Sequence, residues 1–419
     1  MRQPSNRRVV ITGLGAVTDV GRSVPDLWEA VTAGRSGIRT IAAFKQDEQW
    51  AVTIAGEVVD FDASSVMDAR EARRLDRFAL LGVVAAHEAA RDCGIDFSTG
   101  DPYRRGVVIG SGVGGIKTIE EGYDKLLKGG PRKMSPFTVP RLMVNACAGN
   151  VSILHNLRGA NSATATACAT GGHAIGSAYH SIQRGDADVM FAGGSEAAVT
   201  PLCIGSFSAM KALSTRNDEP EKASRPFDRE RDGFVLAEGG AVLILEDLER
   251  ARSRGARIYA EIVGFGTSGD AHHIAAPDPK GEGAKAAMSA ALRDADLPLD
   301  AVDYINAHGT STPLGDAAEV AAIKELFGDH ARNIAVTSSK SMTGHALGAA
   351  GGIESVITIK TIEESVVTPT INCDAPDDGF DLDFVPREAR EQPVRIALNN
   401  TFGFGGHNVC LAFARYDGD

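Results

Sequence analysis

Short runs of apolar and β-branched residues alternate with alanine-rich stretches along the whole chain of 419 residues. Runs such as residues 189–194 and 241–245 are too short for helices and carry no polar alternation, so they predict strands buried on both faces. The alanine-rich stretches between such runs have the composition of helices. Strands that alternate with helices in this way are typical of an α/β fold.

Three segments recur in the same order in the two halves of the chain. The pairs are residues 9–15 with 260–266, residues 89–110 with 291–306, and residues 169–178 with 342–350, where one glycine is skipped. Chance similarity is common in segments rich in glycine and alanine, so these pairs alone leave duplication and coincidence equally open.

No flexible linker separates the two halves. Residues 214–232 are highly charged and contain two prolines, which predicts an excursion on the surface. A helical pattern over residues 248–255 then ends the first half. We expect two similar halves, residues 1–255 and residues 256–419, packed as one body.

Charge and cysteine content exclude several classes of protein. The formal charge of −12 argues against general nucleic-acid binding, because that needs a basic surface to displace counterions from phosphates. No stretch approaches the roughly 18 consecutive apolar residues of a membrane span, and the N-terminal run is too short and glycine-broken for a signal peptide. The six cysteines have neither close pairs nor metal-ligand spacing, which indicates free thiols in a reducing compartment. We expect a cytoplasmic protein that binds no metal, nucleic acid or membrane.

Cys168 follows a run of small residues, 162–167, and precedes a helical pattern. The sequence predicts a strand that leads directly into a helix, with the thiol at the helix N-terminus. There the helix dipole and free N–H groups favour the thiolate, so we expect a lowered pKa and a nucleophilic sulfur. Three other cysteines are assigned the commoner role of buried core residues: Cys93, Cys203 and Cys410.

Two histidines follow predicted strands at matched strand-to-helix turns. His308 lies in residues 304–316, and His345 ends residues 338–345. Open α/β sheets present catalytic groups beyond the carboxyl ends of their strands, so both are candidate catalysts. Four histidines outside such turns are expected to be ordinary polar residues: His87, His155, His180 and His330.

Residues 399–408 form a fourth motif, in which Phe404 stands among three glycines. The loop has neither the Gly-x-x-x-x-Gly-Lys pattern of ATP sites nor the context of a dinucleotide fingerprint, so nucleotide cofactors are not supported. A tight hairpin is one interpretation. The glycines fit better with a backbone N–H aimed at a substrate oxygen and an aromatic gate over a pocket.

Together these segments resemble the β-ketoacyl-acyl-carrier-protein synthases of the thiolase superfamily, over nearly the whole chain. The cysteine segment, the His-Gly-Thr-x-Thr-Pro-x-Gly-Asp segment, the Lys-Ser-Met-Thr-Gly-His segment and the Gly-Phe-Gly-Gly loop occur in the family's order. A cysteine with two histidines is similar to the elongating synthases, whereas thiolases use Cys-His-Cys and initiating synthases Cys-His-Asn. Residues 129–137 resemble the type II elongating enzyme.

The resemblance implies a thiolase-like α/β fold, in which two pseudo-repeated halves form αβαβα layers. It implies decarboxylative condensation of malonyl-acyl-carrier protein with an acyl group on the cysteine, without a cofactor, in fatty-acid elongation by a homodimer. Two alternatives stay open: a polyketide-type ketosynthase and a non-catalytic partner similar to chain-length factors. Asp19, Thr401 and His407 depart from the commonest pattern of the family, which leaves the preferred acyl length open.

The resemblance also implies roles for single residues. Cys168 would carry the acyl group, and His308 and His345 would stabilise the enolate. Backbone N–H groups of Cys168 and Phe404 would polarise the thioester. The remaining roles are Lys340 as a cation near His345, Glu354 behind it, Thr310 and Thr312 on the pantetheine arm, Val113 in the acyl pocket, and Phe402 and Asp270 near the gate.

An acidic carrier protein needs a local basic surface on an acidic enzyme. Residues 125–141 carry five basic residues and no acid, and a second basic group lies in residues 70–77. By resemblance the carrier-docking residues are Arg70, Arg73, Arg74, Arg132, Lys133 and Lys211. A solvated charged face is the plainer interpretation of the arginines.

Overall fold

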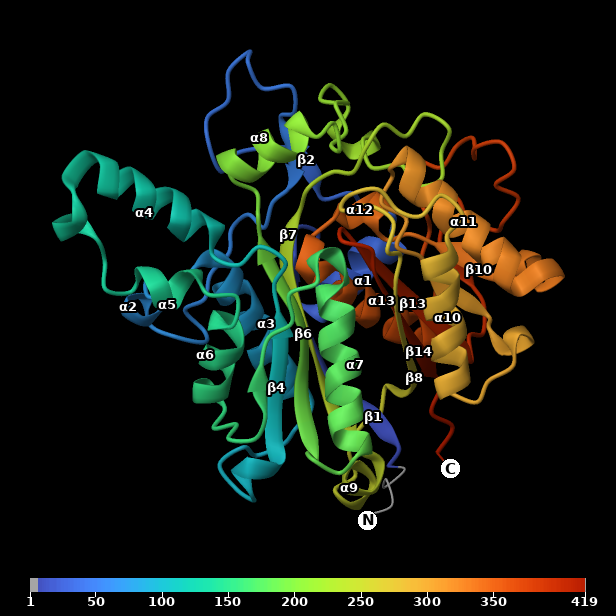
Figure 1. The fold of residues 1–419 in the computed structure, drawn as a ribbon. Coiled ribbons are helices and arrows are strands. Elements are labelled where there is room, and N and C mark those ends of the chain that lie inside the picture. Colours follow the sequence, from blue (N-terminus) through green and yellow to red (C-terminus); the bar gives the residue numbers. More distant parts are fainter. Residues whose placement is uncertain (1–6, 419) are drawn as a thin grey trace.

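The structure, a computed structural model, describes residues 7–418 (Figure 1). Ten strands form one sheet in the order β10-β9-β13-β14-β8-β1-β7-β6-β4-β5. The strands of the first half are β1 (Val9–Thr18), β4 (Arg105–Gly110), β5 (Asn161–Ser162), β6 (Val189–Ala197) and β7 (Glu238–Asp247). Those of the second half are β8 (Ala260–Gly269), β9 (Tyr304–Asn306), β10 (Ala335–Thr337), β13 (Ile396–Gly403) and β14 (His407–Ala414).

The two halves have the same topology. Counted outwards from the centre, the strands of each half stand in the chain order first, fifth, fourth, second, third. In each half the three outer strands are parallel and the remaining pairs antiparallel. Antiparallel pairing of β1 with β8 joins the halves. This symmetry confirms the predicted α/β fold of two pseudo-repeated halves, and on it we propose the division at residue 255, between α9 (Leu248–Ser253) and β8.

Helices cover both outer faces and fill the centre. In the first half α3 (Arg77–Asp92) and α6 (Ala146–Leu154) pack on the outer face. In the second half α10 (Glu282–Asp294) packs on β8 and β14, with α11 (Pro313–Phe327) beside it. The central layer is α7 (Thr170–Gln183) and α13 (Ala350–Glu364), which contact strands of both halves (Figure 1).

Glycines allow the two central helices to touch at the backbone. A Cβ atom on Gly171 would lie 2.7 Å from Gly352 N, and one on Gly351 would lie 2.7 Å from Gly172 N. Only glycine permits this approach. The contact brings together the two short turns that precede the helices, Ala167–Ala169 and Leu347–Ala349.

The structure also corrects the predicted register of one repeat. The pairs that begin at residues 9 and 89 are confirmed, since they fall on β1 with β8 and on α3-β4 with α10-β9. The third pair is wrong by several residues. Because α7 and α13 are equivalent, Gly171-Gly172 matches Gly351-Gly352 and not the glycine before His345. The similar Gly-His letters misplaced that alignment.

The remaining α-helices and strands lie around this body. They are α1 (Val24–Thr32), β2 (Ile38–Thr40), β3 (Ile54–Gly56), α2 (Ala69–Ala72), α4 (Ile116–Gly129), α5 (Thr138–Leu142), α8 (Pro201–Ala209), α12 (Lys340–Thr343), β11 (Val366–Val367) and β12 (Arg390–Glu391). Within residues 7–418 no helix combines the length and apolar character needed to span a membrane.

The charged segment 214–232 is only partly the surface excursion that its composition predicts. Its middle is buried, and the Phe227 ring stacks on Phe384 at 4.3 Å. Two of its arginines are also buried, because Arg225 pairs with Asp228 and Arg231 with Asp316. The number of charged residues wrongly predicted that the whole segment lies on the surface, because charged side chains can be buried when they are paired.

Candidate active site

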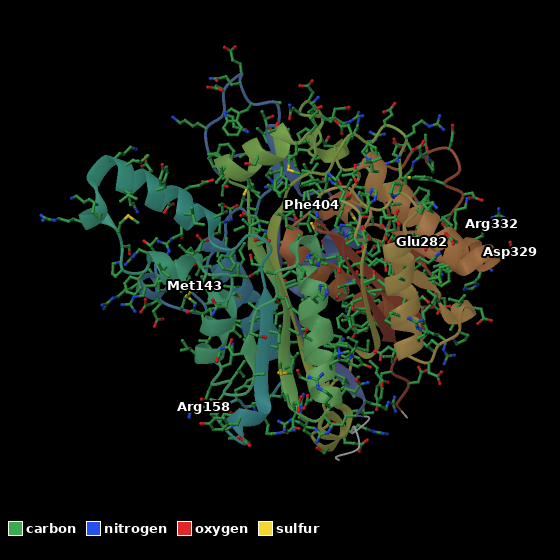
Figure 2. All side chains as sticks on the ribbon, in the orientation of Figure 1. Met143, Arg158, Glu282, Asp329, Arg332 and Phe404 are labelled. Atoms are coloured by element: carbon green, nitrogen blue, oxygen red, sulfur yellow. The ribbon has the colours of Figure 1, made fainter. Side chains whose placement is uncertain are left out.

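A cavity of about 510 Å³ lies between the two halves and is lined by both. Figure 2 shows Phe404 where the differently coloured halves meet. Ten of the residues predicted for the site line this cavity: Val113, Cys168, Lys211, Asp270, His308, Thr310, Thr312, His345, Phe402 and Phe404. Lys340 and Glu354 lie behind the wall as a buried ion pair.

Cys168 occupies a tight turn that the structure places directly before α7. Ala167 opens the turn with φ of 50°, in the left-handed region. The strand predicted to lead into it is wrong, because β5 ends at Ser162 and a loop follows. Hydroxyl bonds hold that loop: Thr164 Oγ1 donates to the Thr170 carbonyl at 2.9 Å, and Thr166 N–H donates to Thr170 Oγ1 at 2.8 Å.

Burial favours the protonated form of the Cys168 thiol. Burial raises the pKa of Cys168 to about 12, although the Lys340 charge and the Phe404 N–H act in the opposite direction. The lowered pKa predicted from the helix N-terminus is therefore wrong, since desolvation outweighs it. Activation needs a base within the cavity. The backbone N–H of Cys168 has no hydrogen-bond partner among residues 7–418.

His308 follows β9 and is held from two sides. Its backbone N–H and that of Gly309 donate to Glu319 at 2.9 and 2.8 Å. Lys340 Nζ donates to the His308 carbonyl at 2.6 Å and lies 3.4 Å from Nδ1 of the ring. An ammonium at Nδ1 leaves the ring proton on Nε2. Lys340 therefore hydrogen-bonds His308 and Glu354, and its charge also acts on His345, near which a cation is expected from the sequence.

His345 approaches the same point from the loop after α12. Its N–H donates to the Val235 carbonyl at 2.8 Å, and its carbonyl accepts from Ala237 at 3.0 Å. The rings of His308 and His345 are 5.3 Å apart, and the nearest ligand atoms of these histidines and Cys168 lie within 4.8 Å of one another. Burial and then the Lys340 charge hold the pKa of both imidazoles well below the ordinary value, so both are neutral.

A thiol and two imidazoles are also zinc ligands by type. The Lys340 ammonium, in contact with His308, repels a cation at this place. A site without metal or cofactor thus stays a prediction.

The glycine loop, residues 399–408, contacts both the turn that contains Cys168 and the loop after β8, which begins at Asp270. A Cβ on Gly403 would lie 2.8 Å from the Thr166 carbonyl, so only glycine fits there. Gly405 N–H donates to the Ile274 carbonyl at 2.7 Å, and Asp270 N–H donates to the Gly406 carbonyl at 3.0 Å. Asn408 Nδ2 donates to Asp270 Oδ1 at 2.6 Å. Asp270 therefore hydrogen-bonds the loop after β8 to the glycine loop.

Two threonines reach the cavity from the start of α11. The hydroxyls of Thr310 and Thr312 are 3.0 Å apart, and Thr312 also caps the helix by accepting from Gly315 N–H at 3.2 Å. The Phe402 ring lies 5.6 Å from that of His308.

Sequence reasoning missed the buried acids behind these loops. Glu319 holds the His308 loop, and Asp316 accepts from Phe227 N–H at 2.8 Å and Ser311 N–H at 3.1 Å. Burial raises the pKa of Asp316 to about 7. A signal was present, because residues 316 and 319 are one turn apart on the helix that follows the histidine motif.

The predicted docking residues are exposed and lie outside the cavity, except Lys211 at its rim. Arg70, Arg73 and Arg74 lie on or just after α2. Arg132 and Lys133 form the turn after α4, and the Arg74 guanidinium stands 5.2 Å from the Phe137 ring, which links the two groups. Their neighbour Arg77 is no surface charge, because it is half-buried against Glu238.

Comparison with known proteins decides the family. Residues 6–251 match the family model of the β-ketoacyl synthase N-terminal domain, and residues 259–374 match the family model of the β-ketoacyl synthase C-terminal domain. The chain belongs to the β-ketoacyl synthase family. A 3-oxoacyl-[acyl-carrier-protein] synthase 2 of Coxiella burnetii is 52% identical over 98% of this chain and 99% of its own. The synthase of the same name from Vibrio harveyi is 49% identical over 98% of this chain and 99% of its own.

Solved structures agree in fold. One solved structure is described as a type II PKS acyl-carrier protein in complex with its ketosynthase bound to the hexaketide. A chain of that structure superposes on this chain with a TM-score of 0.91 at 36% sequence identity, and the match covers 99% of this chain and 100% of that one. A β-ketoacyl synthase from Burkholderia phymatum gives 0.90 at 36% identity, covering 98% and 100%.

Proposed function

We propose that this chain condenses malonyl-acyl-carrier protein with an acyl group on Cys168, with loss of carbon dioxide, in fatty-acid chain elongation. The observation that carries the proposal is one thiol beside two neutral imidazoles, within 4.8 Å, in a cavity reached from solvent. Relatives about half identical over nearly the full length, named 3-oxoacyl-[acyl-carrier-protein] synthase 2, support it.

The first half-reaction loads the enzyme. Cys168 sulfur attacks the acyl thioester while a neutral imidazole takes the thiol proton, and the carrier thiolate leaves and takes that proton. The N–H groups of Cys168 and Phe404 polarise the thioester oxygen. The Phe404 N–H already faces the Cys168 sulfur. One such donor contributes roughly 3 kcal/mol in acyl transfer.

The second half-reaction joins the chains. The bond between the malonyl carboxylate and its α-carbon breaks, and the electron pair forms an enolate. Nε2–H of His308, whose proton Lys340 fixes, and an imidazole N–H of His345 donate to the enolate oxygen. The enolate carbon then attacks the acyl carbonyl, and the expelled Cys168 thiolate takes a proton from solvent.

Mass spectrometry tests this assignment. Incubation with an acyl-carrier protein thioester is expected to add one acyl group, located on the peptide that contains Cys168. Cys168→Ala is expected to abolish both the adduct and condensation, whereas Cys203→Ala, which removes another buried thiol, is expected to retain them. An adduct mainly on Cys147 or Cys203 would contradict the proposal.

A polyketide-type condensation is the second candidate. The structural similarity to a ketosynthase bound to a hexaketide favours it. It is distinguished by products: repeated condensation without reduction would yield poly-β-keto chains, whereas an elongating synthase stops after one addition. A non-catalytic partner is disfavoured because Cys168 lies in an open cavity beside both histidines.

A homodimer is part of the proposal. Strand β5 lies at the open edge of the sheet and is exposed. Large exposed apolar side chains lie on α4 to α6, of which α6 contacts β5, and exposed apolar surface is typical of protein contacts: Tyr123, Leu127, Val139 and Ile153. Sedimentation is expected to give twice the chain mass, and Leu127→Glu is expected to shift it toward the monomer.

The carrier protein is proposed to dock on the basic residues around α2 and the turn after α4. Their exposure and proximity support this, as does the structural similarity to a ketosynthase in complex with its acyl-carrier protein. We also propose a cytoplasmic location, on the basis of the six free cysteines.

A further inference from the structure

Both halves carry the same turn before their central helix. Ala167, with φ of 50°, opens the turn that contains Cys168, and Leu347, with φ of 43°, opens the turn that contains Gly348. Cys168 and Gly348 are therefore equivalent positions of the repeat. Each offers a backbone N–H just before a helix, where negative charge is favoured.

The two N–H groups have different partners. The Gly348 N–H donates to Glu196 Oε2 at 3.1 Å. A Cβ on Gly348 would lie 2.4 Å from Gly112 N and 2.8 Å from Glu196 Oε2, so no nucleophile fits here. In the second half, the Glu196 carboxylate thus lies in front of the Gly348 N–H. The equivalent position in front of the Cys168 N–H, in the first half, is open to the cavity.

The same carboxylate holds the wall of the cavity. Glu196 is fully buried near the end of β6. It also accepts from Ser111 Oγ at 2.6 Å, Gly112 N–H at 2.7 Å and Val113 N–H at 3.3 Å. Four donors from two halves are the arrangement that a buried charge requires. Glu196 therefore connects residues 111–113 of the first half to the second-half turn.

We propose that Glu196 is a positioning residue that fixes Val113 in the wall of the acyl pocket and so sets which acyl lengths the enzyme accepts. Val113 lines the cavity and packs on the same apolar cluster as Cys168, whereas Glu196 does not line the cavity. Glu196 therefore acts through the backbone of Val113. The inference rests on the proposed function, since it needs an acyl group on Cys168.

Glu196→Gln tests the proposal at nearly constant volume. Its amide NH2 would face donors where an acceptor is needed, which loosens residues 111–113. With short, medium and long acyl-carrier thioesters, the ratio of kcat/KM between long and short chains is expected to shift by about tenfold. Malonyl decarboxylation, which depends on the histidines, is expected to stay within about twofold of the parent.

Glu57→Gln is the matched control. Glu57 is also buried and accepts from Ala42 N–H at 2.7 Å and Ala43 N–H at 2.8 Å, but it does not line the cavity. Its loss is expected to lower stability and to leave the length ratio unchanged. An equal shift in Glu57→Gln, or none in Glu196→Gln, overturns the proposal.

Ser111→Ala decides the case if Glu196→Gln does not fold. It removes one donor to Glu196 and the acceptor of Gly114 N–H at 2.8 Å. A smaller shift of the length ratio in the same direction supports the proposal, and a ratio equal to the parent's overturns it. A parent enzyme that forms no acyl-Cys168 would instead refute the proposed function.

Discussion

Burial, and not sequence position, sets the preferred protonation state of the three residues proposed to be catalytic. Cys168, His308 and His345 are all buried, and desolvation favours the neutral form of each. Neutral imidazoles can accept the thiol proton and can donate N–H bonds to an enolate. The Lys340 ammonium, paired with Glu354, lies beside them and further disfavours the cationic form of both imidazoles.

The two histidines are expected to act mainly in the second half-reaction. His308→Ala and His345→Ala should each slow malonyl decarboxylation by about a hundredfold, because an N–H donor to the enolate is lost. Acyl transfer to Cys168 should survive in part. Carbon dioxide release and acyl-enzyme mass, measured separately, check this, and wild-type decarboxylation in either variant would refute the role of that histidine.

The pH profile follows from the same pKa shifts. Since the pKa of both imidazoles lies well below the ordinary value of about 6.5, both stay neutral at and above that pH. Decarboxylation by the parent should therefore show no loss from histidine protonation between about pH 6.5 and 8, so that any change in this window reflects Glu354, whose pKa burial raises to about 7. A rate that rises steadily as pH falls through 6.5 would require a cationic histidine and contradict this prediction.

Asp19, which departs from the family pattern, is expected to make stability depend on pH. Its carboxyl is buried without a hydrogen-bond partner against Gly37 and Gly56, and burial holds its pKa well above the ordinary value, although Arg39 and Arg22 oppose this. The folded protein then binds a proton that the unfolded chain releases near pH 3.9. Stability is full below that pH and is lost as pH rises through the folded pKa.

Asp19→Asn should remove this loss, because the amide never ionises. Chemical unfolding from pH 5 to 9 should show the variant gaining on the parent as pH rises, by about 1–3 kcal/mol at the end of the range. Asp378→Asn, at a fully exposed carboxylate, serves as the control. Parallel profiles for parent and Asp19→Asn would exclude the effect.

At the scale of elements, the sequence predicted which segments meet but not how each is held. Residues of all four motifs line one cavity, and the sequence pattern had already placed each motif at the end of a strand or the start of a helix. The length of β5, the partner of Lys340 and the burial of residues 223–228 were not predictable, since each depends on contacts far along the chain. Glu196 was missed for the same reason: its donors lie 83 to 152 positions away.

Phe404 is the expected gate between the loops. It is about one-third exposed and lies 6.4 Å from the Phe207 ring, at the cavity mouth. Phe404→Ala should slow acylation of Cys168 and weaken discrimination among acyl lengths, because the thioester is no longer covered. Rapid-mixing mass spectrometry measures both. Unchanged acylation and selectivity would leave Phe404 without a gating role.

Val113→Phe should shorten the longest acyl primer accepted. The larger ring would fill volume of the cavity that Val113 and Cys168 both line. The kcat/KM for long primers should fall by about tenfold or more while that for short primers is retained. Long primers accepted as well as by the parent would place the acyl channel elsewhere.

For the whole molecule, the question is how an enzyme of charge −12 would attract the acidic carrier protein proposed as its partner. Reversing the charges of Arg132 and Lys133 should raise KM for acyl-carrier substrates but not for pantetheine thioesters, because steering acts on the carrier. The effect should shrink with added salt, since exposed charges are screened beyond roughly 8 Å at physiological ionic strength. Arg158→Glu is the matched control, an exposed arginine at the end of the molecule away from Phe404 (Figure 2). It lowers the total charge by two without touching the basic surface. If each reversed charge raised KM by as much in Arg158→Glu as in the double variant, the net charge of the enzyme, and not a local docking face, would govern its association with the carrier. Equal losses on carrier and pantetheine substrates would instead mean that the reversal had damaged the cavity itself.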